Sequence, residues 1–331
     1  MKTATSYTIR RRVRGTTLAG ATALVSGVSV FVNSYGVRAG AMPAVYTTAK
    51  NLVAVVALSL VAVIGWSIRA RRAGSAAANF VSTAPEARYV PATRRWVQWL
   101  GLAYLGVIGG GLAFVLFFDG LAESQPTPAA FWRDTLVLWV AVLAVVVLRE
   151  RLRWWNVAAI VLLISGEVVV SGGVGQLAAN RGEADVLISS VLWAFEVVIA
   201  RRLLRTCSPA TLAVVRMGLG AFTLIVYLAV SGSLGQLGAM SADQWHWALW
   251  TGLLLGAYVA TWMSALARAR AIDVASILAS SALITWLLQL VAGTATLSEG
   301  AIGLVLIGAG AALVLVEAYG RSSWRQRTLC A

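Results

Sequence analysis

Charged residues are scarce in this sequence, and histidine and cysteine are scarcer still. Of its 331 residues, 12% are charged and 59% are hydrophobic, whereas about a quarter of an average soluble domain is charged. The chain has one histidine and two cysteines, too few for a disulfide framework or for a site of several Cys and His ligands. The composition therefore excludes an ordinary soluble domain and predicts an integral membrane protein without a metal ion or a cofactor.

Two motifs that carry chemistry are also missing. The chain contains neither G-x-x-x-x-G-K-[ST], which binds the phosphates of ATP, nor H-E-x-x-H, which binds zinc. The one histidine, His246, stands between two tryptophans, which is typical of a membrane interface. We therefore exclude a pump with its own ATPase and do not expect an enzyme.

Basic residues outnumber acidic residues by 27 to 13, and their distribution is informative. If the N-terminus is cytoplasmic, 22 of the 27 fall in cytoplasmic segments, and only Arg38 and Arg181 fall on the opposite side. Because membrane proteins concentrate Lys and Arg on the cytoplasmic side, we predict a multi-pass protein of the bacterial inner membrane, surrounded by lipid, with both termini inside. No basic patch is left over, which excludes a nucleic-acid partner.

Apolar runs long enough to cross a bilayer can be counted ten times. About 20 helical residues span a hydrocarbon core of about 30 Å. The expected helices are 16–36, 43–66, 97–119, 127–148, 154–172, 184–200, 208–230, 245–266, 271–292 and 299–318. The sequence therefore predicts an all-α polytopic membrane protein with ten transmembrane helices.

The second half of the chain repeats the first. Pro43 precedes Lys50 by seven residues, and Pro209 precedes Arg216 by the same number, which sets an offset of 166. An offset of 146 relates Gln98, Gly106 and Gly110 to Gln244, Gly252 and Gly256. An offset of 144 relates Ala159 and Gly166 to Gly303 and Gly310. Each half holds five helices, an odd number, so the second half must insert upside down, as in the inverted repeats of many transporters.

These matches divide the chain into four segments. The loop 67–96 is longer than its counterpart 231–244, which explains the fall in offset. The segments are a basic cytoplasmic tail over 1–15, a first five-helix repeat over 16–172, a second over 183–318, and a cytoplasmic tail over 319–331.

Seven ionisable residues within the expected helices stand out as candidates, because an unpaired charge is costly there. They are Lys50, Asp119, Arg133, Asp134, Glu167, Glu196 and Arg216. Lys50 is expected beside one of the three acids of its own half, and Arg216 beside Glu196. Two interpretations stay open: the charges hold the helices together, or some of them line a substrate path or carry a proton.

A second group of residues suits a small-molecule site. Aromatic walls with a few polar groups are how such sites are built, although each aromatic ring could equally face lipid or the core. The candidates for the substrate cavity are Asn33, Tyr104, Trp132, Trp139, Trp193, Tyr258, Trp262 and Ser280.

Several short motifs resemble the EamA branch of the drug/metabolite transporter superfamily. They are Gly120-Leu121 with Arg149-Glu150 in the first half, Leu192-Trp193-Ala194 at the start of the second, and Gly303-x6-Gly310 near the end. The resemblance spans about 15–320. It implies a basket-like fold whose central cavity is lined by the first, third, fourth, sixth, eighth and ninth helices, with Trp132, Trp193 and Trp262 projecting inward. Relatives in this branch include amino-acid and metabolite exporters.

The leading hypothesis is a secondary transporter that exports a small metabolite, an amino acid or a related compound, by alternating access. A non-transporting scaffold or sensor is one alternative, and a lipid-handling intramembrane protein is another. The expected partners are a small-molecule substrate and the lipid bilayer, and both a monomer and a homodimer stay open.

Overall fold

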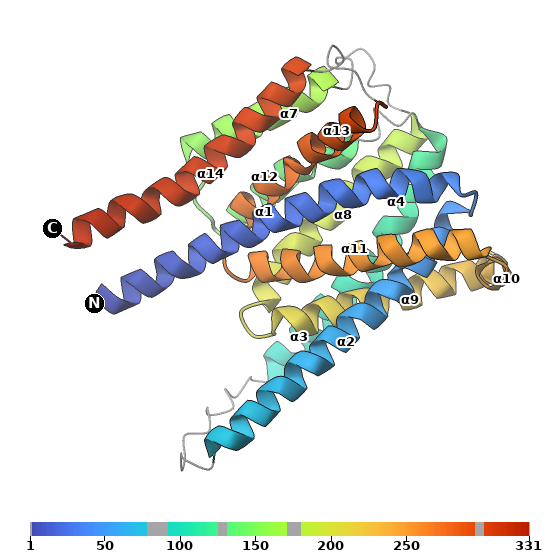
Figure 1. Ribbon diagram of the computed structural model, residues 1–331, viewed down its shortest axis with the longest axis horizontal. Helices are drawn as coiled ribbons and strands as arrows, with labels where there is room; N and C mark the ends of the chain where they lie inside the picture. The colour runs from blue at the N-terminus through green and yellow to red at the C-terminus, as the bar shows by residue number, and fades with distance from the viewer. Residues whose placement is uncertain (1, 78–91, 125–130, 171–179, 295–300, 331) are drawn as a thin grey trace.

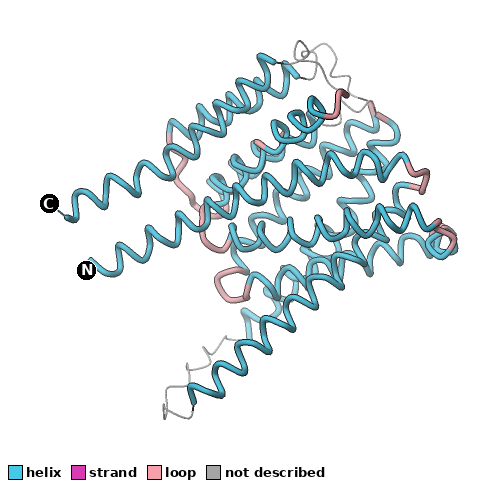
Figure 2. Tube along the Cα trace, viewed as in Figure 1, coloured by secondary structure: helices cyan, strands magenta, loops and turns pink. Residues whose placement is uncertain are grey.

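The chain folds into a bundle of long helices. The computed structural model describes residues 2–77, 92–124, 131–170, 180–294 and 301–330, and within these ranges there is no strand. Figure 2 shows the helices joined by short loops and turns. In the first half they are α1 Lys2–Arg38, α2 Pro43–Ala77, α3 Ala92–Ala103, the π-helix η1 Tyr104–Leu112, α4 Ala113–Glu123, α6 Leu136–Val146 and α7 Trp154–Val170.

The second half has seven helices within the described ranges. They are α8 Arg181–Leu203, α9 Pro209–Val230, α10 Leu234–Gly238, α11 Ala242–Leu266, α12 Ala271–Ala279, α13 Ser281–Val291 and α14 Ala301–Cys330. Both termini lie at one end of the bundle, which we call the terminal end (Figure 1). The opposite end, where α1 turns into α2, is the distal end.

Helix starts follow the local sequence. Pro43 and Pro209 occupy the first turns of α2 and α9, where a missing N–H costs nothing. Ser208 accepts a hydrogen bond from the Thr211 N–H, and Ser241 forms a capping box with Gln244 at the start of α11.

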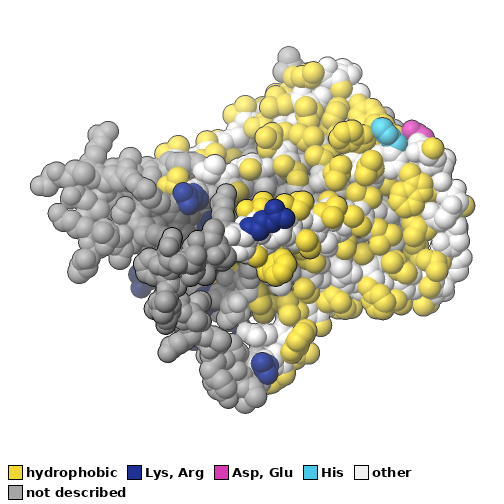
Figure 3. All heavy atoms as spheres, turned by 60° about the horizontal axis from the view of Figure 1, so that its bottom comes forward, with side chains coloured by type: hydrophobic (Ala, Val, Ile, Leu, Met, Phe, Trp, Pro, Cys, Tyr) yellow, Lys and Arg dark blue, Asp and Glu magenta, His cyan; other side chains and the backbone are white. Residues whose placement is uncertain are grey.

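Apolar length and surface identify a membrane protein. Six helices in the described ranges are long and apolar enough to cross a membrane, and two shorter apolar helices cover Trp154–Val170 and Ala301–Glu317. Figure 3 shows one face of the molecule, on which hydrophobic side chains predominate outside the part drawn in grey. Val230 and Val291 are 84% and 87% exposed. Exposing so much apolar surface to water is energetically unfavourable, whereas the apolar chains of a lipid bilayer can contact it without this cost. The polytopic all-α class is therefore confirmed, whereas the count of ten spans remains a prediction.

Small residues set the helix packing in a mirrored pattern. A Cβ on Gly110 of η1 would meet the carbonyl of Arg216 and the Cα of Gly220 on α9, and a Cβ on Gly256 of α11 would meet the backbone of Ala54 on α2. Gly256 is the repeat equivalent of Gly110, and Ala54 is that of Gly220. The third helix of each half thus packs on the second helix of the other.

The last helices of the two halves pack in the same manner. A Cβ on Gly166 of α7 would lie 2.5 Å from the Gly303 carbonyl oxygen of α14, and a Cβ on Gly310 would lie 2.9 Å from that of Ala159. Ala159 and Gly166 are the repeat equivalents of Gly303 and Gly310. The contact is therefore self-complementary, as expected for two elements related by a two-fold axis.

We expect Gly220→Ala to lower the free energy of unfolding by about 1–3 kcal/mol, as over-packing does. The new methyl group would lie 2.6 Å from the Gly110 carbonyl oxygen, which belongs to a helix backbone and cannot move aside. Gly218→Ala on the same helix is the control, since nothing lies within 4 Å of its Cβ. Thermal unfolding of both variants in detergent measures the difference, and equal melting temperatures would contradict the close approach.

Candidate functional site

Two helices are interrupted at equivalent positions of the two halves. The helical segment from Phe131 breaks at Thr135 before α6 begins, and Ser280 separates α12 from α13. Thr135 and Ser280 differ by 145 in number, within the range of the repeat offsets. In both, the hydroxyl group donates a 2.6 Å hydrogen bond to the carbonyl three residues earlier, that of Trp132 or Ile277. Both residues keep right-handed helical backbone angles, so each interruption is confined to a single residue.

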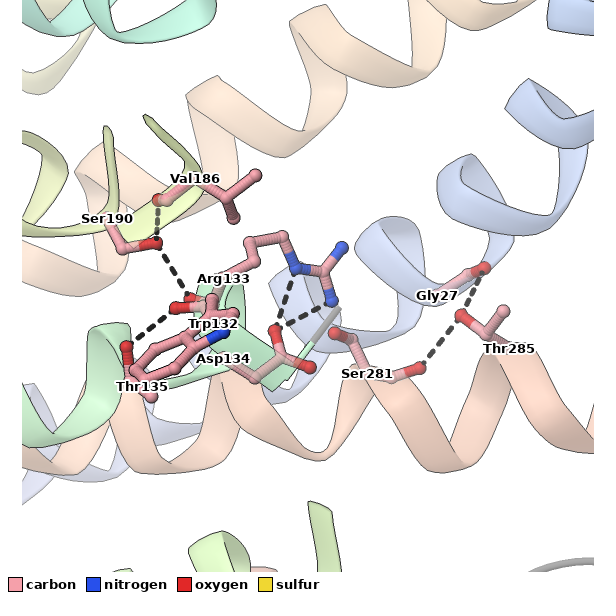
Figure 4. A network of polar contacts seen from close by, with 9 residues as sticks. All are labelled: Gly27, Trp132, Arg133, Asp134, Thr135, Val186, Ser190, Ser281 and Thr285. Atoms are coloured by element: carbon pink, nitrogen blue, oxygen red, sulfur yellow. Dashed lines mark hydrogen bonds and ion pairs between the residues drawn. The ribbon is translucent and has the colours of Figure 1, made fainter. Parts of the chain in front are cut away.

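An arginine and an aspartate directly precede the first interruption. The Arg133 Nε donates to Asp134 Oδ1 at 2.8 Å, and the Arg133 Nη2 lies 2.7 Å from the same oxygen. The side chains of Arg133 and Asp134 are 28% and 14% exposed, respectively. Ser190 of α8 donates to the Arg133 carbonyl, which the interruption leaves free, and the guanidinium group points away from it (Figure 4). Within the described residues, Arg133 Nη1 has no hydrogen-bond partner, so this cation can accept a further anion.

Glu167 brings a second carboxyl group to this pair from α7. Its carboxyl group lies within electrostatic range of Asp134 and Arg133. Glu167 is 5% exposed, and its Oε1 has no hydrogen-bond partner in the described part of the chain. One arginine and two acids of the predicted charge set are therefore together near the distal end.

The predicted pair between Glu196 and Arg216 is present. The Arg216 Nε donates to Glu196 Oε1, and its Nη2 donates to Oε2 at 3.0 Å, a two-pronged geometry that suits a carboxylate. The side chains of Arg216 and Glu196 are only 8% and 4% exposed, respectively. Gly109 of η1 lies against Glu196 and leaves it room. The expectation for Arg216 is confirmed.

Tyr258 of α11 connects the two charge clusters. Its hydroxyl group is within electrostatic range of Arg133, Arg216 and Glu196. The Tyr258 ring stacks on Trp262, with ring centroids 6.1 Å apart. The structure thus brings residues of both halves to one interior region with arginine, carboxylate and aromatic groups.

Lys50 differs from the expectation. Its ammonium group donates to the Asn33 amide oxygen at 3.3 Å and lies over the rings of Tyr46 and Phe118, with 5.6 and 5.3 Å to the centroids. The residue is 8% exposed, and no carboxylate pairs with it in the described ranges. An amide dipole and two ring faces stabilise the cation instead.

Asp119 lies apart from the other intramembrane charges. It is exposed on α4, where its partner is the Tyr227 hydroxyl group and its charged neighbours are Asp185 and Glu123. It therefore does not join Lys50.

The remaining aromatic candidates occupy distinct places. Trp132 donates to Glu183 Oε2 at 2.8 Å, and Tyr104 donates to the Leu192 carbonyl at 3.1 Å. Trp193 donates to the Gly109 carbonyl of η1 at 3.0 Å. Trp139 packs beside the main core, and its Nε1 has no partner within the described residues. Ser280 is committed to its own helix rather than free to bind a substrate.

Sequence reasoning missed the π-helix η1. A π-helix places carbonyl groups out of register with the α-helical pattern and is frequent at functional sites. Its run of glycines, Gly109 to Gly111, was the available signal, since glycine permits the close approach to Glu196 and α9.

A network at the terminal end, which we call the latch, also escaped prediction. Glu150 follows Arg149, whose φ of 55° makes a sharp turn after α6. The Glu150 carboxylate accepts hydrogen bonds from the N–H groups of Ala271 and Ile272 at 3.1 and 3.4 Å. Burial raises the pKa of Glu150, and these backbone hydrogen bonds oppose the increase. The carboxylate of the first half therefore caps α12 of the second.

The same network contains an arginine that ties α12 to the first half. Arg270 pairs with Asp273 at 2.5 Å, and it donates to the Arg151 carbonyl at 3.2 Å and to Asn156 Oδ1 at 3.3 Å. Arg202 of α8 donates to the Val147 carbonyl at 2.7 Å. The latch therefore joins the two halves at the terminal end.

The described residues offer no metal centre, because no group of three or more His, Cys, Asp or Glu side chains among them could hold an ion.

Known proteins resemble this chain in sequence and in fold. The profile of the EamA-like transporter family matches residues 13–172 and again residues 180–316. The chain is 27% identical over 135 residues to "Uncharacterized transporter YyaM" of Bacillus subtilis (strain 168), a match that covers 39% of this chain and 43% of that protein. The match thus spans less than half the length of this curated relative.

A solved structure called "Crystal structure of protein" has the same fold, with a TM-score of 0.66 and 20% identity, over 91% of this chain and 98% of that one. At this identity the likeness shows the fold alone. The two family matches, however, cover most of the sequence. The chain therefore belongs to the EamA-like transporter family, within the drug/metabolite transporter superfamily.

Proposed function

We propose that this chain is a secondary transporter of the bacterial inner membrane that exports a small metabolite, an amino acid or a related compound. It works by alternating access between two inverted five-helix repeats, with both termini in the cytoplasm. Family membership supports a membrane transporter in general.

The mirrored packing supports the inverted repeats. Gly110 meets Gly220 as Gly256 meets Ala54, and the contact of α7 with α14 is self-complementary. Such contacts arise when two similar units face one another in opposite orientation. A static scaffold gains nothing from this symmetry.

Arg133 is the observation that carries the substrate proposal. Its guanidinium group is partly exposed at a helix interruption and has an unused donor. A substrate carboxylate could pair with this donor, since a guanidinium group matches carboxylate geometry. Tyr258 and Trp262 supply aromatic surface near it.

The latch supports alternating access. Glu150 and Arg270 hold the two halves together at the terminal end, so a route from the cytoplasm must break these contacts. A lipid-handling protein, the remaining alternative, has its substrate enter from the side and does not require the latch to open.

We expect cells that make the protein to release at least one metabolite that control cells retain, and we expect Arg133→Gln to abolish the difference. Glutamine keeps a hydrogen-bond donor but removes the charge that holds a carboxylate. Arg205→Gln is the matched control, because Arg205 is exposed beyond the end of α8. Mass spectrometry of the medium, normalised to folded protein, gives the measurement. Identical profiles with and without the wild-type protein would contradict export.

A further inference from the structure

Lys50 and Arg216 are the matching cations of the two repeats, and the structure surrounds them differently. Each stands seven residues after the proline that begins its helix, α2 or α9. Both residues are buried, with 8% and 6% of their surface exposed, respectively. A positive charge at such depth in an apolar bundle is costly unless an anion or a polar group meets it. The contacts of each cation therefore show how its charge is balanced.

The two cations find their partners on the first helix of their own half. Glu196 of α8 accepts two hydrogen bonds from Arg216, and Asn33 of α1 accepts one from the Lys50 ammonium group at 3.3 Å. Glu196 follows Asn33 by 163 residues, close to the 166 that separate Arg216 from Lys50. The first half thus repeats the arrangement of the second with one change: a neutral amide stands where the second half has a carboxylate.

Neighbouring groups hold the partners of Lys50 in place. The Asn33 Nδ2 donates to the Ser29 carbonyl at 2.7 Å and to the Ser29 hydroxyl group at 3.1 Å, so its Oδ1 is the atom that remains to face Lys50. The hydroxyl group of Tyr46 forms a 2.8 Å hydrogen bond with that of Thr251, which fixes the ring beside the ammonium group. The surroundings of Lys50 are therefore arranged in advance, as in a binding site.

No carboxylate pairs with Lys50 in the part of the chain that the structure describes. Asp134, Glu196 and Asp273 pair with arginine side chains, and Asp119 is exposed on α4. An ammonium group has three N–H donors, whereas the described residues accept one hydrogen bond from it. Lys50 therefore has a positive charge without a counter-charge and donors for a further acceptor.

Aromatic rings of α4 extend from Lys50 toward Arg216. The ammonium group lies 5.3 Å from the centroid of the Phe118 ring, and this ring stacks on Phe114 with centroids 6.4 Å apart. The Arg216 guanidinium group lies 5.9 Å from the Phe114 centroid, and Trp193 of α8 meets the same ring edge-on at 5.2 Å. These rings are only partly buried. A cation beside partly exposed aromatic surface is a combination from which small-molecule sites are built.

We propose that Lys50, Asn33 and Phe118 form a second binding site, which takes a carboxylate with an aromatic or other apolar body. The carboxylate of the ligand pairs with Lys50 as the Glu196 side chain pairs with Arg216 in the other half. The apolar body lies along the rings of α4. The site is near the distal end, since Asn33 is in the last turns of α1 and Lys50 in the first turns of α2 (Figure 1).

The place of this site in transport rests on the proposed function. With both termini in the cytoplasm, the distal end faces outward, so an exported carboxylate meets Lys50 on its way out. Binding to Lys50 itself does not depend on transport and can be measured on the isolated protein.

Titration calorimetry of the purified full chain with benzoate, in a non-ionic detergent, tests the site. The titrated protein carries Arg133→Gln, so that the carboxylate site proposed at Arg133 does not contribute. We expect this protein to bind benzoate. Benzamide is the matched ligand, because it has the same ring without a charge, and it should not bind at the same concentrations.

Two further substitutions in the Arg133→Gln protein remove the site in different ways. Lys50→Gln removes the cation, whereas Asn33→Asp keeps Lys50 and supplies a carboxylate from α1, as Glu196 does from α8. Each should weaken benzoate binding about 10- to 100-fold, the usual effect of losing a hydrogen bond to a charged group. Arg205→Gln, at an exposed position, should leave the affinity unchanged. Size-exclusion chromatography establishes that each titrated protein is folded.

Unchanged benzoate affinity in Lys50→Gln, or no binding by the folded Arg133→Gln protein, would overturn the site. Displacement of benzoate by an equal concentration of chloride would overturn a carboxylate as the ligand. A protein that binds benzoate through Lys50 while cells release no metabolite would support the site and contradict the proposed transport function.

Discussion

Arg216→Ala is expected to lower the free energy of unfolding by about 3–5 kcal/mol, the usual cost of breaking a buried ion pair from one side. The substitution leaves the Glu196 carboxylate 4% exposed and without the two donors that now hold it. Folded yield after size-exclusion chromatography in detergent and the apparent melting temperature should both fall. Arg205→Ala, at an exposed site, should change neither.

The double variant Arg216→Met/Glu196→Leu separates stability from transport. Replacing both charges with apolar side chains of similar size is often neutral or stabilising, so this protein should fold and unfold close to the wild-type temperature. If the pair contributes to transport, the well-folded double variant should release no metabolite. Wild-type release from it would assign the pair to the fold alone.

Glu150→Ala is expected to open the terminal end. The substitution removes the carboxylate that caps α12, and a lost cap costs about 0.5–2 kcal/mol. Because the lost contact exists only when the two halves touch, the population with an open terminal end should rise by roughly two- to thirtyfold.

Cysteine labelling measures this opening. Ser276 lies on α12, about one turn beyond Ile272 of the latch, and is 0% exposed, so a cysteine placed there should react slowly in a background that lacks Cys207 and Cys330. Adding Glu150→Ala should speed its reaction with a water-soluble maleimide by a similar factor. Asp243→Ala, at the distal end, is the control, and unchanged labelling in Glu150→Ala would show that the latch does not control access.

Much of the architecture could be predicted because a lipid bilayer restricts the backbone conformations that can cross it. Long apolar runs must become helices, since hydrocarbon offers no partner for a free N–H or carbonyl group. The prolines seven residues before Lys50 and Arg216 mark helix starts, and α2 and α9 begin at these two prolines, Pro43 and Pro209. The pairing of Arg216 with Glu196 was also accessible, because a buried arginine requires an anion.

The details of the site depend on three-dimensional context. Lys50 is held by Asn33 and aromatic rings, an alternative that hydropathy does not distinguish from a carboxylate partner. The breaks at Thr135 and Ser280 occur without a nearby proline. Each depends on a hydroxyl group that satisfies a nearby carbonyl, and serine and threonine do this in many continuous helices as well.

The seam between α7 and α14 also bears on mechanics. Gly166 and Gly303 bring the two backbones together, and Ala159 and Gly310 repeat the contact nearby. Close-packed backbones resist sliding, because neither has a long side chain that could change rotamer to make room. This seam is therefore expected to act as the pivot between the two halves. When one half rotates against the other, the displacement of the backbone should be smallest at the seam and should grow with distance toward α2 and α9.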